Sequence, residues 1–346
     1  MKRRLSSLDR VTLDLSAPKR PLVISMGDPA GIGPEVTAKA WLALREGPIA
    51  FCVLGDPALY TSVPTHPISE VSQAVQVFGE ALPVLQGFEA RGVVVGQPNA
   101  AHAGVILHAI KRGVDLVLSG QASALVTAPI AKSVLMAAGF SHPGHTEFLG
   151  ALLSTTHFDQ TRGPVMMLAV DGLRVVPVTI HCALSEVPGR LTQQAIIDAG
   201  LVTAEALQRD FGLTAPRLVV AALNPHAGED GAFGDEEARI IAPAVAALQA
   251  KGLTVRGPLP ADSLFHGEAR GTYDAAICMY HDQALIPLKA LDFWGGVNAT
   301  LGLPIIRTSP DHGTGFDIAG QGIARPDSMI AAMRMAATMA QERMRR

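Results

Sequence analysis

Short apolar runs alternate along this chain with longer amphipathic stretches, and this alternation restricts the fold more than any other feature. Several of the runs are continuously apolar, as in strands that are covered on both faces. The expected strands are Leu22–Met26, Ala50–Leu54, Gly92–Val95, Leu116–Val126, Val165–Val170, Arg174–Ile180, Arg217–Leu223 and Ala275–Tyr280. The expected helices include Leu191–Gly212, Asp235–Gly252 and Pro326–Arg345. Strands that alternate with helices in this way predict an α/β fold with a largely parallel sheet.

The composition supports a large core and disfavours several classes of protein. The 346 residues suffice for about two domains. With 48% hydrophobic and 17% charged residues, the chain does not resemble a disordered protein. Its 28 Lys and Arg residues against 31 Asp and Glu residues give a net charge of −3, which provides no basic field for nucleic acid or a membrane surface.

The cysteines and the N-terminal residues bear on the cellular compartment. The 3 cysteines show no C-x-x-C spacing and fit a reducing compartment. No apolar stretch approaches the ~18 residues that cross a bilayer. Residues 1–20 carry basic residues without a hydrophobic segment behind them, so we expect a flexible extension rather than a secretory signal. We therefore expect a cytoplasmic protein without a membrane or nucleic-acid partner.

Three histidines follow expected strands. His181 and His281 each come directly after a strand, and His226 comes shortly after another. Ligands of α/β sheets bind outside the carboxyl ends of the strands, so three imidazoles there can converge on one divalent metal and leave open positions, as in a catalytic site. For each histidine taken alone, a bond to a nearby carbonyl is the simpler interpretation. His266 and His312 are competing ligands.

Three loops carry further candidates. The glycines of Gly27–Glu35 permit a tight strand-to-helix turn, for packing or for a ligand, but their spacing is not that of the dinucleotide fingerprint. The sequence P-G-H-T-E exposes His145 and Thr146 for a substrate, unless Thr146 is a helix N-cap. Asp262 follows two prolines in a rigid loop, where it is another N-cap, a base or a group that holds a substrate amine.

Basic and amide side chains gather after His281. Lys289, Asn298 and Arg307 follow it, and the last two lie in a stretch rich in Gly, Thr, Asn and His. Lys and Arg in such a stretch suit a phosphate or a carboxylate, and Arg supplies a bidentate fork. A salt bridge is the simpler interpretation for either residue alone.

Six motifs occur in order between about Pro21 and about Ser328. They are G-D-P-A-G-I-G-P-E, P-G-H-T-E-F-L, N-P-H-A-G-E, G-P-L-P-A-D, Y-H-D-Q-A-L-I-P-L-K and G-V-N-A-T-L-G-L-P-I-I-R-T-S-P-D-H-G-T. Together they resemble the 4-hydroxythreonine-4-phosphate dehydrogenase family of pyridoxal phosphate biosynthesis. A set of six motifs in register is far more specific than any one of them.

The resemblance implies a fold similar to that of isocitrate and isopropylmalate dehydrogenases, with two α/β/α domains and an interdomain cleft. We expect residues 1–20 as an extension, 21–137 plus 307–346 as the first domain, and 138–306 as the second domain, which carries the metal ligands. By analogy with that wider class, His312 would approach the adenine of the dinucleotide and Asp317 its ribose hydroxyls.

The resemblance also implies the site. The metal ligands would be His181, His226 and His281; the substrate contacts would be His145, Thr146, Lys289, Asn298 and Arg307. Asp262 matches an acid important for catalysis, and Asp262 or Lys289 would accept the hydroxyl proton. The family implies a homodimer with each site at the subunit interface, one histidine ligand from the partner chain, zinc, magnesium or cobalt as the metal, and NAD or NADP as the oxidant.

The expected reaction oxidises 4-phosphooxy-L-threonine to a β-keto acid, which decarboxylates to 3-amino-2-oxopropyl phosphate. Related dehydrogenases acting on a threonate phosphate or on a cyclic dihydrodiol carboxylate are alternatives. A metal-dependent hydrolase, or a protein that only binds a metal or a sugar phosphate, would need no dinucleotide.

The chain departs from the family pattern in two places. Cys182 follows His181 where an aliphatic residue is frequent, and it would point to the opposite side if the strand continued. Asp230 and Ala232 stand where Gly and His are frequent. None of the three expected imidazoles is replaced, but the choice of substrate is less constrained.

Overall fold

The computed structural model describes residues 20–345 except 141 and 143, without the His145 side chain. Its contacts divide the chain into two compact units. The central unit comprises residues 157–303, and the terminal unit comprises residues 20–156 and 304–345. These contacts group 138–156 and 304–306 with the terminal unit, whereas the sequence placed them in the second domain. The expected extension lies outside the described residues except for Arg20.

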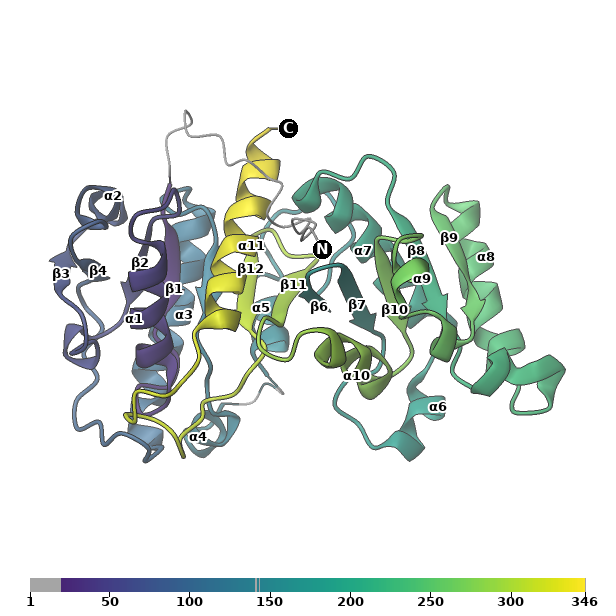
Figure 1. Ribbon diagram of the computed structural model, residues 1–346, viewed down its shortest axis with the longest axis horizontal. Helices are drawn as coiled ribbons and strands as arrows, with labels where there is room; N and C mark the ends of the chain where they lie inside the picture. Colours follow the sequence, from purple (N-terminus) through teal and green to yellow (C-terminus); the bar gives the residue numbers. More distant parts are fainter. Residues whose placement is uncertain (1–19, 141, 143, 346) are drawn as a thin grey trace, which may run out of the picture. The chain divides into compact units, whose positions relative to one another are not determined.

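The terminal unit contains a parallel sheet in the order β3-β4-β2-β1-β5-β12. Its strands are β1 (Leu22–Ser25), β2 (Phe51–Leu54), β3 (Thr65–Ile68), β4 (Leu82–Leu85), β5 (Leu125–Thr127) and β12 (Arg307–Pro310). Its helices are α1 (Gly33–Leu44), α2 (Ala74–Val77), α3 (Ala103–Leu118), α4 (Lys132–Ala137), α5 (His145–Leu152) and α11 (Asp327–Met344). Helices α1 and α11 pack together in front of this sheet, and α3 lies behind it (Figure 1).

The central unit contains a mixed sheet in the order β11-β6-β7-β10-β8-β9. Its strands are β6 (Val165–Val170), β7 (Leu173–Pro177), β8 (Arg217–Ala221), β9 (Thr254–Leu259), β10 (Ala275–Cys278) and β11 (Val297–Leu301). Strand β6 runs antiparallel to both of its neighbours, whereas β7, β10, β8 and β9 run parallel. Its helices are α6 (Val187–Arg190), α7 (Gln193–Phe211), α8 (Ala242–Ala250), α9 (Gly267–Arg270) and α10 (His281–Leu291).

Apolar packing covers the central sheet on both faces. Alternate strand residues such as Val175 and Val219 join Ala284 and Leu288 of α10 in one buried cluster. The intervening residues are buried as well, and α7 contacts β6, β8, β10 and β11. This double coverage explains why these strands are continuously apolar, and the expected α/β fold is confirmed.

The residues at the two ends of helix α7 explain where this helix begins and ends. Thr192 Oγ1 accepts a hydrogen bond from the Ala195 amide at 3.1 Å, and Gly212 ends the helix with a left-handed φ of 69°. Both ends match the expected helix, because a hydroxyl satisfies a free amide and glycine adopts positive φ without steric cost.

Two expected strands are wrong. Gly92–Val95 forms turns, because Gly92 and Gly96 take positive φ angles and the Val94 and Val95 side chains are exposed. In Leu116–Val126, the first residues complete α3 and only the last two belong to β5. A polar turn separates these two apolar elements. Among the described helices, none combines the length and the apolar character that a membrane crossing requires.

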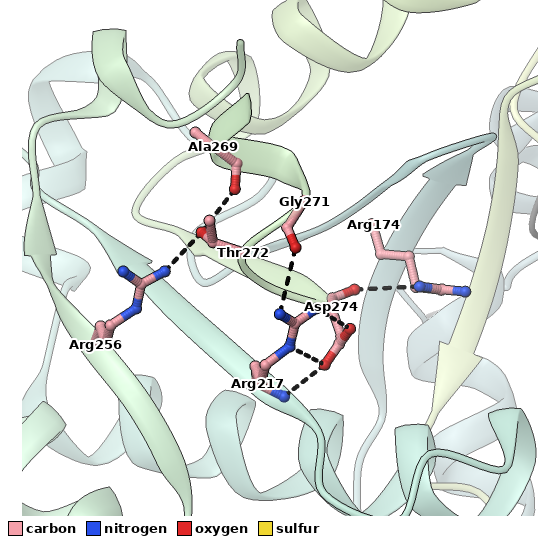
Figure 2. A network of polar contacts seen from close by, with 7 residues as sticks. All are labelled: Arg174, Arg217, Arg256, Ala269, Gly271, Thr272 and Asp274. Atoms are coloured by element: carbon pink, nitrogen blue, oxygen red, sulfur yellow. Dashed lines mark hydrogen bonds and ion pairs between the residues drawn. The ribbon is translucent and has the colours of Figure 1, made fainter. Parts of the chain in front are cut away.

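A charged network fastens the start of β8 to the start of β10 (Figure 2). The Arg217 side chain donates to both carboxylate oxygens of Asp274 at 3.0 and 3.2 Å, and its backbone amide donates at 2.7 Å. Arg174 donates to the Asp274 carbonyl at 3.3 Å. Burial alone would raise the pKa of Asp274, but the hydrogen bonds from Arg217 and the charges of both arginines outweigh it and lower that pKa.

We expect Asp274→Asn to lower the free energy of unfolding by about 2 kcal/mol at neutral pH, because three bonds to a charged acceptor are weakened. The folded-state pKa lies below that of the unfolded chain, so this stabilisation exists at neutral pH and disappears as the pH falls through the folded-state value. Chemical denaturation at neutral and acidic pH measures the difference. The exposed Asp159→Asn control should change stability by less than about 0.5 kcal/mol. An equal loss for Asp274→Asn at both pH values would show that its charge does not matter.

Candidate active site

The sheet of the central unit brings two of the expected histidines together. Strands β7 and β10 are neighbours in parallel register, with Cys278 opposite Pro177. The pairing continues beyond the end of β7. The Val178 amide donates to the Cys278 carbonyl at 2.8 Å, and the Thr179 amide donates to the Met279 carbonyl at 3.2 Å. The two segments therefore leave the sheet side by side, and the ring centroids of His181 and His281 lie 5.9 Å apart.

An open pocket of about 570 Å³ surrounds these two rings. Its lining also includes the carboxylate residues Glu186 and Asp282. Nδ1 of His281 lies 2.7 Å from Oδ1 of Asp282. When Nδ1 of the neutral imidazole donates to this carboxylate, Nε2 has its lone pair available for another ligand. Such a carboxylate partner is typical of histidines that bind metals.

The side chains of this pocket can be compared with the ligands that a metal ion requires. Two imidazoles at this separation, one with a carboxylate behind it, suit a divalent cation as part of its ligand set. In the part of the chain that the structure describes, however, no group of three or more His, Cys, Asp or Glu side chains could hold a metal ion. The described residues of one chain therefore bring two of the expected imidazoles together without a third ligand beside them.

His226 lies at the same edge of the central sheet, after β8, which pairs with β10. Its segment is tied to that of His281 by Gln283, which is buried. Gln283 Oε1 accepts from the Met279 amide at 2.7 Å, and its Nε2 donates to the Ala222 carbonyl at 2.6 Å. The ring of His226 lies 6.0 Å from that of Phe233. The structure thus places all three histidines at carboxyl ends of adjacent parallel strands and pairs two of them.

Cys182 lines the same pocket as His181, contrary to the expected opposite orientation. That expectation assumed a continuing strand, but β7 ends at Pro177 and the Cys182 amide donates to the Ile180 carbonyl in a tight turn. The alternation of side chains therefore stops before Cys182.

Three further candidates belong to the central unit. Asp262 is exposed in the short turn Ala261–Ser263 after β9, and Pro260, not Asp262, precedes that turn as its N-cap. Lys289 lies in the last turn of α10, with its ammonium 5.2 Å from the Phe293 ring centroid. Asn298 is on β11, and its buried Oδ1 has no hydrogen-bond partner among the described residues. An unsatisfied buried carbonyl of this kind fits a donor on a bound ligand.

The terminal unit carries the other substrate candidates. Arg307 at the start of β12 is only 2% exposed, and its Nε and Nη2 donate to Thr127 Oγ1 at 3.1 and 2.6 Å. Burial lowers the pKa of Arg307 to about 10, so the group remains a cation at neutral pH. Gly144 is the N-cap of α5, so Thr146 is inside the helix instead of capping it. His145 begins α5, and its side chain lies outside the described part.

The glycine-rich turn of the terminal unit packs against the expected cofactor segment. The Ile32 amide donates to the Thr314 carbonyl at 2.8 Å, and a Cβ on Gly31 would lie 2.7 Å from that oxygen. Packing therefore requires glycine at position 31. A pocket of about 470 Å³ adjoins this turn; its lining includes Pro29, Gly31, Glu35, Val95, Gly320 and Gly322. His312 and Asp317 do not line it.

Sequence reasoning missed two residues of the site. In the sequence Gln283 is only a near neighbour of His281, and its bridging role depends on the pairing of β10 with β8. Glu237 is one of three acids at the start of the expected helix Asp235–Gly252, and acids are common at the positive end of the helix dipole. In the structure its carboxylate is buried against the segment that carries His226.

The fold and the site define an α/β enzyme whose histidines gather at the carboxyl edge of a sheet. A family model for "Pyridoxal phosphate biosynthetic protein PdxA" matches residues 49–336. The chain belongs to this family. The family predicted from the six motifs, and with it a dehydrogenase, are confirmed.

Individual relatives agree with the family model. The 4-hydroxythreonine-4-phosphate dehydrogenase of Caulobacter vibrioides is 60% identical over 94% of this chain and 98% of its own length. The crystal structure of the enzyme of that name from Klebsiella pneumoniae superposes with a TM-score of 0.81 at 38% identity, covering 94% of this chain and 99% of the other. A terephthalate 1,2-cis-dihydrodiol dehydrogenase from Burkholderia xenovorans LB400 gives a TM-score of 0.62 at 27% identity, covering 92% and 98%.

Proposed function

We propose that this chain oxidises 4-phosphooxy-L-threonine, with a nicotinamide dinucleotide as oxidant, to a β-keto acid that decarboxylates to 3-amino-2-oxopropyl phosphate. The names of the relatives support the substrate class. The observation that carries the proposal is the pairing of His181 and His281, 5.9 Å apart, with Asp282 behind the second ring. The proposed place of this reaction is the cytoplasm, without a nucleic-acid or membrane partner.

The proposed metal site is completed by a second copy of the chain. His181 and His281 of one subunit and His226 of the partner subunit would supply three imidazoles, which suit zinc or cobalt better than magnesium. When bound, the cation would lower the pKa of the substrate's secondary hydroxyl and stabilise negative charge on that oxygen during decarboxylation. The resemblance of the six motifs to the family supports a homodimer with sites at the subunit interface, and the described residues of one chain supply two of the three proposed imidazoles side by side.

The chain's own residues would bind and orient the substrate. Arg307 offers a cation with a planar fork for the phosphate, and Lys289 a point charge for the carboxylate. Asn298, with its free buried oxygen, would accept a hydrogen bond from the substrate amine. His145 and Thr146, in the first turn of α5, would contact the phosphate. Asp262 would take the hydroxyl proton, because a carboxylate can accept one directly whereas an ammonium group cannot.

The terminal unit would bind the dinucleotide, which supplies the hydride acceptor of the reaction. Nδ1 of His312 lies 3.0 Å from the Gly313 carbonyl, and its buried Nε2 has no partner among the described residues. That nitrogen would accept a hydrogen bond from the adenine amino group. The exposed carboxylate of Asp317 suits two ribose hydroxyls and would repel a 2′-phosphate, so we propose NAD in preference to NADP.

Absorbance of reduced nicotinamide at about 340 nm tests the proposal. We expect it to rise with 4-phosphooxy-L-threonine and NAD, to stop after chelation, and to return with zinc. Unphosphorylated 4-hydroxythreonine, a threonate phosphate and a cyclic dihydrodiol carboxylate serve as comparison substrates. Faster oxidation of one of these would identify a related dehydrogenase, which the similarity to the dihydrodiol enzyme makes the second candidate. Failure to reduce NAD or NADP with any of them would contradict dehydrogenase chemistry at this site.

A further inference from the structure

The turn that carries His226 has an unusual backbone. Within Pro225–Gly231, the non-glycine residues His226, Ala227, Glu229 and Asp230 have φ angles of 53°, 56°, 42° and 53°. Together with Gly228 they form a left-handed turn, which side chains of L-residues disfavour through contact of Cβ with the backbone. Such conformations persist only where the surrounding structure enforces them, and they concentrate at functional sites.

The buried carboxylate of Glu237 fixes the entrance to this turn. Its Oε1 accepts hydrogen bonds from the amides of Leu223 and Asn224 at 2.8 and 2.7 Å. Its Oε2 accepts from Asn224 Nδ2 at 2.9 Å, and the other proton of that amide goes to Glu236 Oε2 at 2.8 Å. Glu237 is 5% exposed. In the folded protein these donors therefore replace the water molecules that would otherwise bind both carboxylate oxygens.

The same carboxylate reaches the middle of the turn. A Cβ built on Gly228 would lie 2.8 Å from Glu237 Oε2, so the turn passes directly over this oxygen. Glu237 itself starts the helical segment Glu237–Ile241, which leads into α8. One rigid element therefore determines where the chain leaves β8 and where the following left-handed residues lie.

We propose that Glu237 is a positioning residue that holds the left-handed turn so that His226 faces the metal. This inference rests on the proposed function, in which His226 is a ligand. Glu237 does not touch the metal or the substrate. It acts by restricting the backbone of the turn, so that the imidazole is already oriented before the cation binds.

The test uses the full-length protein and its affinity for zinc, measured by competition with a chelator. Glu237→Gln keeps the acceptor for the two backbone amides but places an NH2 group against the NH2 group of Asn224. We expect zinc affinity to fall by about 10- to 100-fold, as for other residues that orient metal ligands. Amide hydrogen exchange should become faster across the turn of His226.

Glu205→Gln is the matched control. Glu205 lies in α7 of the same unit, and its carboxylate accepts from the amide and the hydroxyl of Thr161, both at 2.7 Å. It therefore holds a loop that carries no proposed ligand. It should lower the denaturation midpoint and leave zinc affinity unchanged. If Glu237→Gln does not fold, Glu236→Gln removes one charged acceptor of Asn224, and it should weaken zinc binding by roughly 2- to 10-fold.

His226→Ala separates failure of this inference from failure of the proposed function. If His226→Ala loses zinc while Glu237→Gln, or Glu236→Gln in its place, retains full affinity, then Glu237 does not position the ligand. If His226→Ala binds zinc as tightly as the unchanged protein, the proposed ligand set is wrong and this inference falls with it. Weaker zinc binding in both variants with unchanged binding in Glu205→Gln supports the positioning role.

Discussion

Replacing His281 with alanine is expected to lower kcat/KM for 4-phosphooxy-L-threonine by at least about a thousand-fold, because a metal that stabilises an oxyanion supplies several kcal/mol. The change removes one ring of the 5.9 Å pair and leaves the Asp282 carboxylate without its imidazole partner. Zinc affinity should fall in parallel. Steady-state reduction of NAD and a zinc competition titration measure the two effects.

Two further variants make this result specific. Asp282→Asn keeps the imidazole but weakens its carboxylate partner, so zinc affinity should fall by only about 10- to 100-fold. His266→Ala removes an exposed histidine of the same unit that does not line the pocket, and it should leave both readouts unchanged. Full turnover of His281→Ala in metal-free buffer would refute a metal-dependent reaction at this site.

The strands that could be predicted are those that are buried on both faces and therefore form a continuous apolar run in the sequence. Strands β1, β2, β6, β8 and β10 follow that pattern. Strand β3 was missed because its residues are partly exposed and include a histidine and a proline, and β4 because four residues with a proline give little periodicity. Conversely, the valines of Gly92–Val95 are apolar but exposed, so residue type alone predicted a strand that the glycine turns prevent.

The sequence predicted that each histidine of the candidate site follows a strand. It did not predict which of these histidines lie next to one another in space. The spatial order β7-β10-β8 differs from the order along the chain, so no local spacing indicates that His181 pairs with His281. The inward direction of Glu237 was equally hidden, since an acid at the start of a helix has an ordinary explanation on the surface. The first depends on the pairing of β7 with β10, and the second on hydrogen bonds from the amides of Leu223 and Asn224 to the Glu237 side chain.

Arg307→Met is expected to raise the KM for the phosphorylated substrate by about 100- to 1,000-fold with a smaller effect on kcat, because loss of one partner of a buried charged pair costs about 2–5 kcal/mol. The guanidinium is buried, and desolvation lowers its pKa to about 10. Deprotonation would then begin to weaken substrate binding as the pH approaches that value. Initial rates with varied substrate at neutral and alkaline pH measure both effects.

Arg307→Lys distinguishes the geometry of the group from its charge. Lysine retains the cation but loses the planar fork, so we expect only part of the affinity to return. The melting temperature without substrate reports the separate effect on stability, because Arg307→Met also removes the bonds to Thr127. With unphosphorylated 4-hydroxythreonine the difference between variant and unchanged protein should nearly vanish. A variant that melts early but keeps its KM would instead assign Arg307 to the stability of the β5–β12 pair, and the phosphate would need another cation.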